Sequence, residues 1–184
     1  MTGRHESVVD GYSLELARPT DAPRLAAMSN ALVESGLRPA WNASRIQWHM
    51  RHAESVVLTA RVASHPGMHA AYGAQAVAAF AIMRFGDDAA HLNLLAVDPS
   101  HQRRGVGHQL IAWLEETAIT AGTFVIGLEL RSTNASALRF YARLGYQELG
   151  VVPGYYQGVE HAIRMSRDVR SGRGTVPGMR QPSP

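Results

Sequence analysis

The chain of 184 residues contains no cysteine and, among its 18 basic residues, no lysine. Without cysteine it has no thiol nucleophile, no disulfide and no cysteine-bound zinc site. Without lysine it cannot form the Walker A loop, in which a lysine follows the second glycine and binds phosphate. A G-x-S-x-G motif is missing too, so the sequence gives no support to a serine hydrolase.

Long apolar segments are also missing. The longest apolar run covers residues 76–83, far fewer than the roughly 20 residues that a membrane-spanning helix needs. Residues 1–11 carry no apolar core of the kind found in signal peptides. We therefore expect a cytoplasmic protein with no membrane partner.

Charge of one sign does not dominate the body of the chain. The chain has 18 arginines and 15 acidic residues, and three of the arginines follow the last acid, Asp168. The segment up to Asp168 therefore holds 15 arginines and 15 acids, and we expect no nucleic-acid partner. We interpret residues 169–184 as a disordered tail rich in arginine, glycine and proline. An arm that binds nucleic acid is the alternative.

The hydrophobic pattern predicts a mixed succession of strands and helices. Strands are expected at residues 12–16, 55–63, 75–85, 92–97 and 124–131, followed by two more after Gly145. Helices are expected at residues 21–35, 42–53, 106–121 and 134–144. His65-Pro66-Gly67 is expected to turn the chain between the second and third strands.

The centre of this pattern is a strand, a glycine-bearing loop and a helix. The strand at residues 92–97 ends at Asp98-Pro99, because proline cannot donate to a strand ladder. In the loop, Gly105 and Gly107 allow backbone N–H groups to point at one site. The N-terminus of the following helix adds partial positive charge there.

Two arginines strengthen the prediction of an anion site. Arg103 and Arg104 would supply full charge and bidentate donors suited to phosphate. The loop is therefore predicted to bind an anion such as a pyrophosphate. A dinucleotide fingerprint would need a third glycine or alanine three residues after Gly107, where this chain has Leu110.

The loop also carries a family resemblance. It resembles the Q/R-x-x-G-x-G/A loop of the GNAT superfamily of acyl-CoA-dependent N-acetyltransferases through Gln102-Arg103-Arg104-Gly105-Val106-Gly107. Further segments resemble the RimI-type branch, which acetylates the N-terminal residue of a ribosomal protein; these are residues 95–99, 128–134, 138–141, 144–146, 155–156 and 158–165. The resemblance implies an α+β GNAT fold, with a mixed, mostly antiparallel sheet of about seven strands and about four helices. It would occupy residues 12–168 as a single domain, after a flexible N-terminus at residues 1–11.

The resemblance also implies the cofactor contacts. Acetyl-CoA is expected as co-substrate, with no metal. Its pantetheine arm and thioester carbonyl would meet the backbone of Leu95, Ala96 and Val97. Its pyrophosphate would lie in a cradle formed by Arg103, Arg104, Gly105, Val106, Gly107 and His108. Asn134 would touch the pantetheine arm or, as the alternative, cap the helix that follows it.

Glu129 is the candidate general base. In the strand predicted at residues 124–131, it shares a face with Val125, Gly127 and Arg131, opposite a purely apolar face. Gly127 leaves room beside the carboxylate for water or substrate. Glu129 could therefore take the proton that an amine must lose before it attacks a thioester. The alternative is an ion pair between Glu129 and Arg131.

Tyr141 is the candidate general acid. On the helix predicted at residues 134–144, Leu138 and Leu144 at i−3 and i+3 indicate that its ring faces inward. By resemblance to the RimI-type branch, this tyrosine protonates the departing CoA thiolate. From the residues alone, a core tyrosine with a satisfied hydroxyl is the alternative.

The acceptor amine is expected between two loops. The resemblance places it between residues 34–41 and residues 153–158, where Trp41, Tyr155 and Tyr156 would build an aromatic-walled slot. An amine at a protein or peptide N-terminus is favoured, because its pKa near ~8 makes it easier to deprotonate than a lysine near ~10.4.

Two departures from the RimI-type pattern leave the acceptor open. Residues 151–154 lack the basic residues that usually precede the tyrosines, and His161 stands where that branch usually has an acid. A small amine, such as a polyamine, amino acid or aminoglycoside, is therefore an alternative acceptor. A non-catalytic acyl-CoA-binding regulatory module is a third reading, against which Glu129 and Tyr141 both argue.

The nine histidines do not form a metal-binding pattern. His65 and His69 are four residues apart, but Pro66-Gly67 between them disfavours a helix. His49 and His52 could share a helix face, without a carboxylate one turn away to complete a site. We therefore expect no metal.

Overall fold

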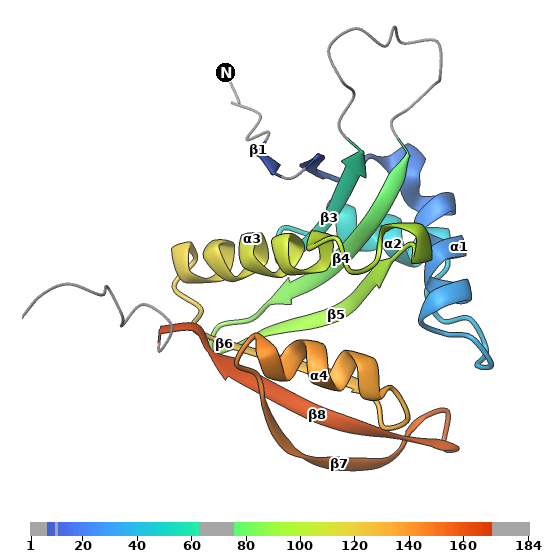
Figure 1. The fold of residues 1–184 in the computed structure, drawn as a ribbon, viewed down its shortest axis with the longest axis vertical. Helices are drawn as coiled ribbons and strands as arrows, with labels where there is room; N and C mark the ends of the chain where they lie inside the picture. Colours follow the sequence, from blue (N-terminus) through green and yellow to red (C-terminus); the bar gives the residue numbers. More distant parts are fainter. Residues whose placement is uncertain (1–6, 10, 63–75, 171–184) are drawn as a thin grey trace, which may run out of the picture.

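The computed structural model describes residues 7–9, 11–62 and 76–170. These residues form one sheet with helices on both of its faces (Figure 1). In chain order the elements are β1 (Ser7–Val9), β2 (Tyr12–Leu16), η1 (Pro19–Asp21), α1 (Ala22–Leu32), α2 (Ala43–Arg51), β3 (Ser55–Val62), β4 (Val77–Phe85), β5 (Ala90–Val97), η2 (Pro99–His101), α3 (Val106–Thr120), β6 (Val125–Arg131), α4 (Ala135–Arg143), β7 (Gln147–Tyr156) and β8 (Glu160–Asp168). In the described part of the chain, no helix is long and apolar enough to cross a membrane.

The sheet is mixed and mostly antiparallel, as expected. Its strand order is β1-β2-β3-β4-β5-β6-β8-β7, and only the β5–β6 pair is parallel. It has eight strands rather than about seven, because Ser7–Val9 pairs with β2 at one edge. That short strand lies within the N-terminal segment that we expected to be flexible.

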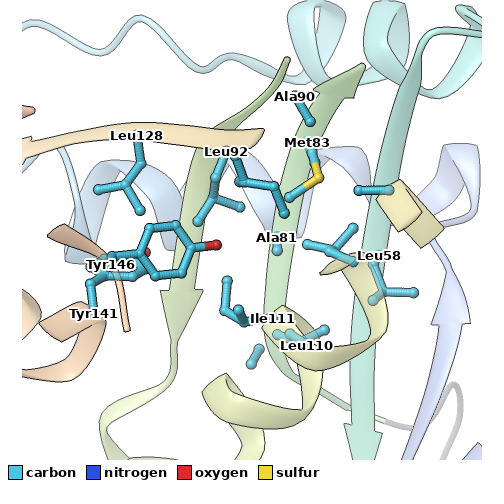
Figure 2. Close-up of a cluster of buried hydrophobic side chains, with 14 of the residues drawn as sticks. Leu58, Ala81, Met83, Ala90, Leu92, Leu110, Ile111, Leu128, Tyr141 and Tyr146 are labelled. Atoms are coloured by element: carbon cyan, nitrogen blue, oxygen red, sulfur yellow. The ribbon is translucent and has the colours of Figure 1, made fainter. Parts of the chain in front are cut away.

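Two apolar cores fill the space between the sheet and the helices. On one face, Leu110 and Leu114 of α3 pack in the same cluster as Met83, Leu92 and Leu128 of the strands, part of which is drawn in Figure 2. On the other face, α1 and α2 pack against the sheet through a second cluster, which includes Leu25, Ile46, Phe80, Ile82 and Leu94. The buried residues of α1 and α3 recur at helical spacing, so one side of each helix faces the sheet.

A β-bulge in β5 changes the direction of its side chains. Ile82 pairs with Leu94 and Met83 pairs with Leu92, so Asn93 is the extra residue. Although Leu92 and Leu94 are two residues apart, they belong to the cores on opposite faces of the sheet. Bulges bend a strand and re-aim its side chains, and they are frequent next to functional sites.

The parallel strands β5 and β6 separate soon after they meet. Their pairing covers only Ala90–Leu92 of β5 and Ile126–Leu128 of β6. Beyond Leu92, β5 stays paired with β4, and β6 stays paired with β8. The sheet therefore divides between β5 and β6, and this split widens toward the C-terminal ends of both strands.

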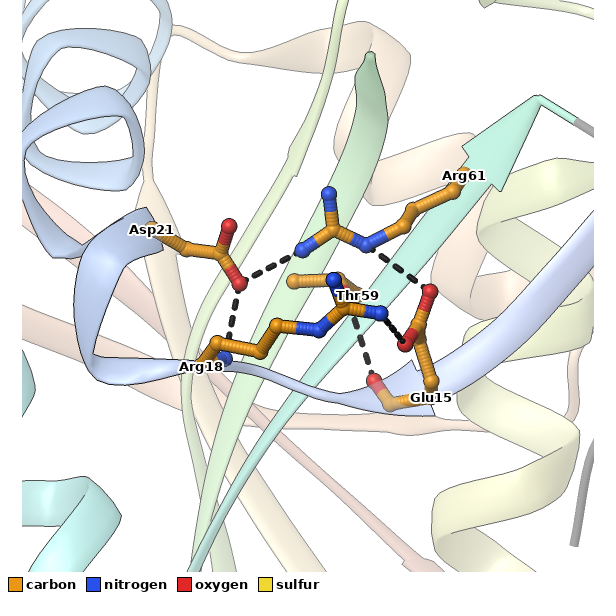
Figure 3. Close-up of polar contacts among 5 residues, drawn as sticks. All are labelled: Glu15, Arg18, Asp21, Thr59 and Arg61. Carbon is orange, nitrogen blue, oxygen red and sulfur yellow. Dashed lines mark hydrogen bonds and ion pairs between the residues drawn. The ribbon is translucent and has the colours of Figure 1, made fainter. Parts of the chain in front are cut away.

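A buried ion network fixes β2 and the short helix η1, which leads into α1, to β3 (Figure 3). Arg61 on β3 is 2% exposed and forms ion pairs with Glu15 on β2 and Asp21 on η1. Arg18 contacts both acids as well, through its side chain to Glu15 and its backbone N–H to Asp21. Because a buried charge is costly when unpaired, the network strongly favours this placement of α1.

Most of the predicted elements are confirmed, with ends that differ by a few residues. The first helix ends at Leu32 and the second at Arg51, both earlier than expected. Gly122 has a φ of +81° just after α3, and Gly145 one of +88° just after α4, a left-handed conformation that is common where helices end. The turn at His65-Pro66-Gly67 and most of the predicted tail lie outside the described residues.

Candidate active site

The loop before α3 ends in an open helix N-terminus. Gly105 is the N-cap residue, with a φ of +79°, and no side chain caps the helix. The first helical hydrogen bond runs from the N–H of Gln109 to the carbonyl of Gly105 at 3.1 Å. The N–H groups before Gln109 therefore have no acceptor within the helix. With the helix dipole and the exposed Arg103 and Arg104, they supply the donors and the charge that a phosphate needs.

Gly107 allows this N-terminus to approach its neighbours closely. A Cβ at Gly107 would lie 3.4 Å from Cζ of Phe140 on α4 and 3.6 Å from Cγ2 of Val97 on β5. The side-chain amide of Gln102 donates to the carbonyl of Val97 at 3.1 Å. The loop therefore lies against the end of β5 and beside α4, at the split in the sheet.

The backbone of Leu95, Ala96 and Val97 borders the split. These residues pair with β4 on one side, and β6 has already diverged on the other. Backbone groups on that open side are not used by the β5–β6 ladder, so an extended ligand can bind them as a further strand would. This arrangement supports the predicted pantetheine contacts.

Asn134 caps α4. Its side-chain oxygen accepts a hydrogen bond from the N–H of Ala137 at 3.0 Å, which is the usual role of an N-cap asparagine. The side-chain oxygen of Asn134 therefore caps the helix, which was the alternative to a contact with the pantetheine arm. The amide nitrogen of Asn134 is still able to donate to a ligand.

Glu129 lies one residue beyond the point where β5 and β6 separate. Its side chain is only 7% exposed, and its Oε1 lies 2.8 Å from Nε of Arg164 on β8. Its Oε2 lies 3.1 Å from Nε2 of His91 on β5 and accepts a hydrogen bond from the hydroxyl of Tyr155 at 3.3 Å. Burial and the nearby carboxylate raise the pKa of Tyr155, so this phenol stays protonated as a donor.

The predicted alternative for Glu129, an ion pair with Arg131, is wrong. Arg131 instead contacts Glu160, with Nη2 at 2.6 Å and Nε at 2.7 Å from Oε2. It also donates to the carbonyl of Ser35 at 2.7 Å. The hydrogen bonds from Arg131 and Thr133 lower the pKa of Glu160, so Arg131 already has an ionised partner.

Tyr141 lies inside the core on the α3 side of the sheet, as its helical position predicted. It is 7% exposed and belongs to the same cluster as Leu128 and Leu130 of β6, and Figure 2 shows it beside Tyr146. Burial raises the pKa of Tyr141, so it keeps its proton at neutral pH.

Glu129 and Tyr141 therefore flank the split from opposite faces. Leu128 and Leu130 point to the core that holds Tyr141, and Glu129 alternates with them along β6. Tyr156 lies beside Glu129, because its hydroxyl donates to the carbonyl of Glu129 at 3.4 Å. A group bound between β5 and β6 would have a carboxylate on one side and a phenol on the other.

The two loops expected to flank the acceptor are joined. The N–H of Arg38 donates to the side chain of Gln157 at 3.2 Å, and that side chain donates to the carbonyl of Arg38 at 2.8 Å. Glu34, which is 6% exposed, accepts from the N–H groups of Ala40 at 2.6 Å and Trp41 at 3.3 Å. The loop before α2 is thereby held at the mouth of the split.

The histidines of α2 have structural partners. His49 is buried and hydrogen-bonds to the hydroxyl of Ser55 at 2.9 Å, and burial lowers its pKa. His52 bonds to the carbonyl of Trp48 and stacks on its ring. Among the described residues, no three His, Asp or Glu side chains gather as they would around a metal ion. His65 and His69 lie outside the described residues.

Two residues of the site, His91 and Arg164, were not predicted from the sequence. Both reach Glu129 from neighbouring strands. The strand pattern alone places each of them on a face, but it does not give the register between strands. In the structure His91 stands opposite Gly127, and Arg164 stands opposite Glu129.

Comparison with known proteins points to one family. A model described as the Acetyltransferase (GNAT) family matches residues 34–146, more than half of the chain. The ribosomal protein bS18 alanine N-acetyltransferase of Salmonella typhimurium is 42% identical over 93 residues, which cover 49% of this chain and 63% of that protein. The protein of the same name from Escherichia coli is 39% identical with the same coverage. The chain thus matches less than two thirds of the length of these relatives.

Solved structures share the fold. The ribosomal-protein-S18-alanine N-acetyltransferase from Escherichia coli superposes with a TM-score of 0.67 at 26% identity, over 86% of this chain and 94% of that one. NAA60 from Arabidopsis thaliana, in complex with acetyl-CoA, reaches a TM-score of 0.72 at 15% identity, over 86% and 99%. The chain therefore belongs to the GNAT family of acetyltransferases, and its relatives include the RimI-type branch that its sequence resembles.

Proposed function

We propose that the protein is an acetyl-CoA-dependent N-acetyltransferase whose acceptor is the amine at a protein or peptide N-terminus. One observation carries this proposal: the sheet splits between β5 and β6, with Glu129 on one face of the split and Tyr141 on the other. The open N-terminus of α3 lies at the same split. The proposed base, the proposed acid and the proposed anion site thus lie around the same split.

The cradle fits acetyl-CoA. The N–H groups at the start of α3, with Arg103, Arg104 and His108 around them, would bind the pyrophosphate. The backbone of Leu95, Ala96 and Val97 would pair with the pantetheine arm along the open side of β5. The bound thioester supplies an acyl carbon that an amine can attack. An N–H of this strand would donate to the oxygen that becomes negative during the attack.

Proton movements at the split follow from the two flanking residues. Glu129 takes a proton from the acceptor ammonium, directly or through a water, and the N–H bond breaks as an O–H bond forms. The free amine attacks the thioester carbonyl, forms the new C–N bond and expels CoA as a thiolate. Tyr141 keeps its proton at neutral pH because burial raises its pKa. It therefore donates a hydrogen bond to the departing sulfur. As the C–S bond breaks, the nitrogen of the new amide loses its second proton and the sulfur gains one through Tyr141, which is left protonated.

The N-terminal acceptor is favoured by the relatives and by the acidity of an α-ammonium group. The relatives from Salmonella and Escherichia coli are named for the alanine of ribosomal protein bS18. An α-amine near pKa ~8 is also easier to deprotonate than a lysine near ~10.4, which suits a site with a single carboxylate as base.

A thioester-cleavage assay with a mixed panel tests this function. The panel contains peptides with free N-termini, the same peptides blocked at the N-terminus but carrying lysine, and small amines such as polyamines. We expect CoA release with free N-termini and little with the blocked peptides. Turnover restricted to small amines would contradict the proposed acceptor. Absence of turnover with every amine would contradict catalysis itself.

A further inference from the structure

We propose that the acceptor peptide carries acidic side chains close behind its N-terminal residue, and that Arg38 and Arg45 select them. The inference rests on the proposed transfer to a protein or peptide N-terminus, and it adds which N-termini the site prefers. It follows from the charges around the entrance of the split, between the loop that joins α1 to α2 and the turn that joins β7 to β8.

The carboxylates near this entrance already have partners. Glu129 is paired with Arg164, and Glu160 is paired with Arg131, so neither pair adds net charge. Glu34 is buried and turned toward N–H groups of its own loop. These acids are therefore not available to neutralise further cations at the surface of the entrance.

Two arginines at the entrance have no such acidic partner. Arg38 is exposed and lies on the loop whose backbone Gln157 holds through two hydrogen bonds. Arg45 is exposed near the start of α2, where its guanidinium carbon lies 4.1 Å from the centre of the Trp41 ring and its Nη1 donates to the carbonyl of Ala40 at 3.4 Å. Within residues 7–9, 11–62 and 76–170, no carboxylate forms an ion pair with either arginine.

Arg45 is close enough to act on the reaction centre through its charge. The hydroxyl of Tyr155 contacts Glu129 at 3.3 Å. Burial and Glu129 raise the pKa of Tyr155, whereas the charges of Arg164 and Arg45 lower it. A peptide whose α-amine reaches Glu129 extends outward by about 3.3 Å per residue. Its next residues therefore pass the surface that carries Arg38 and Arg45.

Charge complementarity identifies the side chains that suit this surface. A guanidinium binds a carboxylate through two parallel hydrogen bonds and repels other cations. An acidic residue behind the acceptor amine would gain an ion pair with Arg38 or Arg45, whereas a basic residue in the same place would be repelled. The same charges attract an acidic peptide before it binds, and this attraction weakens as salt is added.

Three acceptor peptides test the preference. All begin with alanine, and they differ only at their second and third residues, which are both glutamate, both glutamine or both arginine. We expect kcat/KM to be roughly 5- to 20-fold higher for the glutamate peptide than for the glutamine peptide, and lowest for the arginine peptide. At about 0.5 M salt the preference for glutamate should shrink to about twofold, because the ion pairs lie at the surface.

Substitutions show whether these two arginines cause the preference. The quantity compared is the ratio of kcat/KM between the glutamate and glutamine peptides, so any loss common to both peptides cancels. In Arg38→Gln combined with Arg45→Gln, the ratio should fall to about 2 or less. Arg45→Lys keeps the charge and should keep most of the ratio. Arg51→Gln, at an exposed arginine on the other end of α2, is the matched control and should keep the ratio of the parent.

Binding of the peptides is measured separately from acetyl transfer. Each peptide is titrated calorimetrically into the parent and the double variant in the presence of CoA. Tighter binding of the glutamate peptide to the parent, lost in the double variant, supports the inference even without turnover. Equal kcat/KM and Kd for the glutamate and glutamine peptides, or a preference that survives in the double variant, would overturn it. Absence of acetyl transfer to every peptide would contradict the proposed function instead, so the two failures are distinct.

Discussion

At the scale of single residues, we expect the largest loss of kcat from a change at the carboxylate of Glu129. Glu129→Gln keeps the size of the side chain and removes its charge, so an enzyme that uses this base should lose about 10²–10⁴-fold in kcat. The Kd for acetyl-CoA should change little, because the expected cofactor contacts lie on β5 and α3. Steady-state kinetics and calorimetric titration measure the two quantities. Glu148→Gln, at an exposed carboxylate of β7, is the matched control, and equal loss in both variants would remove Glu129 from the mechanism.

The hydroxyl of Tyr141 is expected to help CoA depart. Tyr141→Phe should lower kcat by roughly 10- to 100-fold, at or below the usual range for acid–base groups, because a thiolate leaves easily. Since burial raises the pKa of Tyr141 above its ordinary value, the phenol stays protonated between pH 7 and 10. The parent should therefore show no loss of kcat in that range from ionisation of Tyr141.

A neighbouring tyrosine provides the control for this variant. Tyr146 lies in the same core, 5.5 Å from Tyr141 between ring centroids, and Tyr146→Phe should retain the activity of the parent. If Tyr141→Phe transferred acetyl groups as fast as the parent at every pH, the hydroxyl would have no part in the reaction.

At the scale of elements, the helix α4 depends on its cap. Asn134→Ala removes the hydrogen bond to Ala137 and should lower the free energy of unfolding by about 1 kcal/mol. Asn134→Asp keeps an accepting oxygen and should lose little stability, but it has no amide donor for the pantetheine arm. Thermal unfolding, with and without acetyl-CoA, measures both effects. A tighter or unchanged Kd for acetyl-CoA in Asn134→Asp would show that Asn134 only caps the helix.

The ion network around Arg61 should matter more for stability than for chemistry. Arg61→Ala leaves Glu15 and Asp21 without their buried partner and should cost about 3 kcal/mol, or roughly 6–12 °C in Tm. Arg18→Ala is the control, because its side chain is 56% exposed and its ion pair with Glu15 lies at the surface, so its loss should cost at most about 1 kcal/mol. Similar melting temperatures for the two variants would contradict a structural role for the buried arginine.

Local patterns predicted the elements and the faces of their residues. The alternation along β6 placed Glu129 opposite Leu128 and Leu130, and the structure agrees, because this period depends only on neighbouring residues. The contacts of Glu129 were not predictable in this way. Arg164 is 35 residues away along the chain and meets Glu129 only through the β6–β8 register. The bulge at Asn93 likewise depends on pairing with β4.

At the scale of the whole molecule, contacts across the split hold the two parts of the sheet in place. Arg131 on β6 donates to the carbonyl of Ser35, beyond α1, and Gln157 beyond β7 pairs with the backbone of Arg38. These contacts are non-local, so the sequence predicted the neighbouring loops only through the family resemblance. They bring the N-terminal and C-terminal parts of the chain together at the expected entrance of the acceptor.

The central claim is that the start of α3 and the open side of β5 bind acetyl-CoA. At 100 times its Kd, acetyl-CoA should add about 2.7 kcal/mol to the free energy of unfolding and raise Tm by about 5–10 °C. Arg103→Gln combined with Arg104→Gln removes two charges from the cradle and should weaken the binding, more strongly at low salt. Binding is therefore measured by calorimetric titration of acetyl-CoA into the parent and the double variant. The account predicts saturable heat that decreases in the variant, and a parent without measurable affinity for acetyl-CoA or CoA would contradict it.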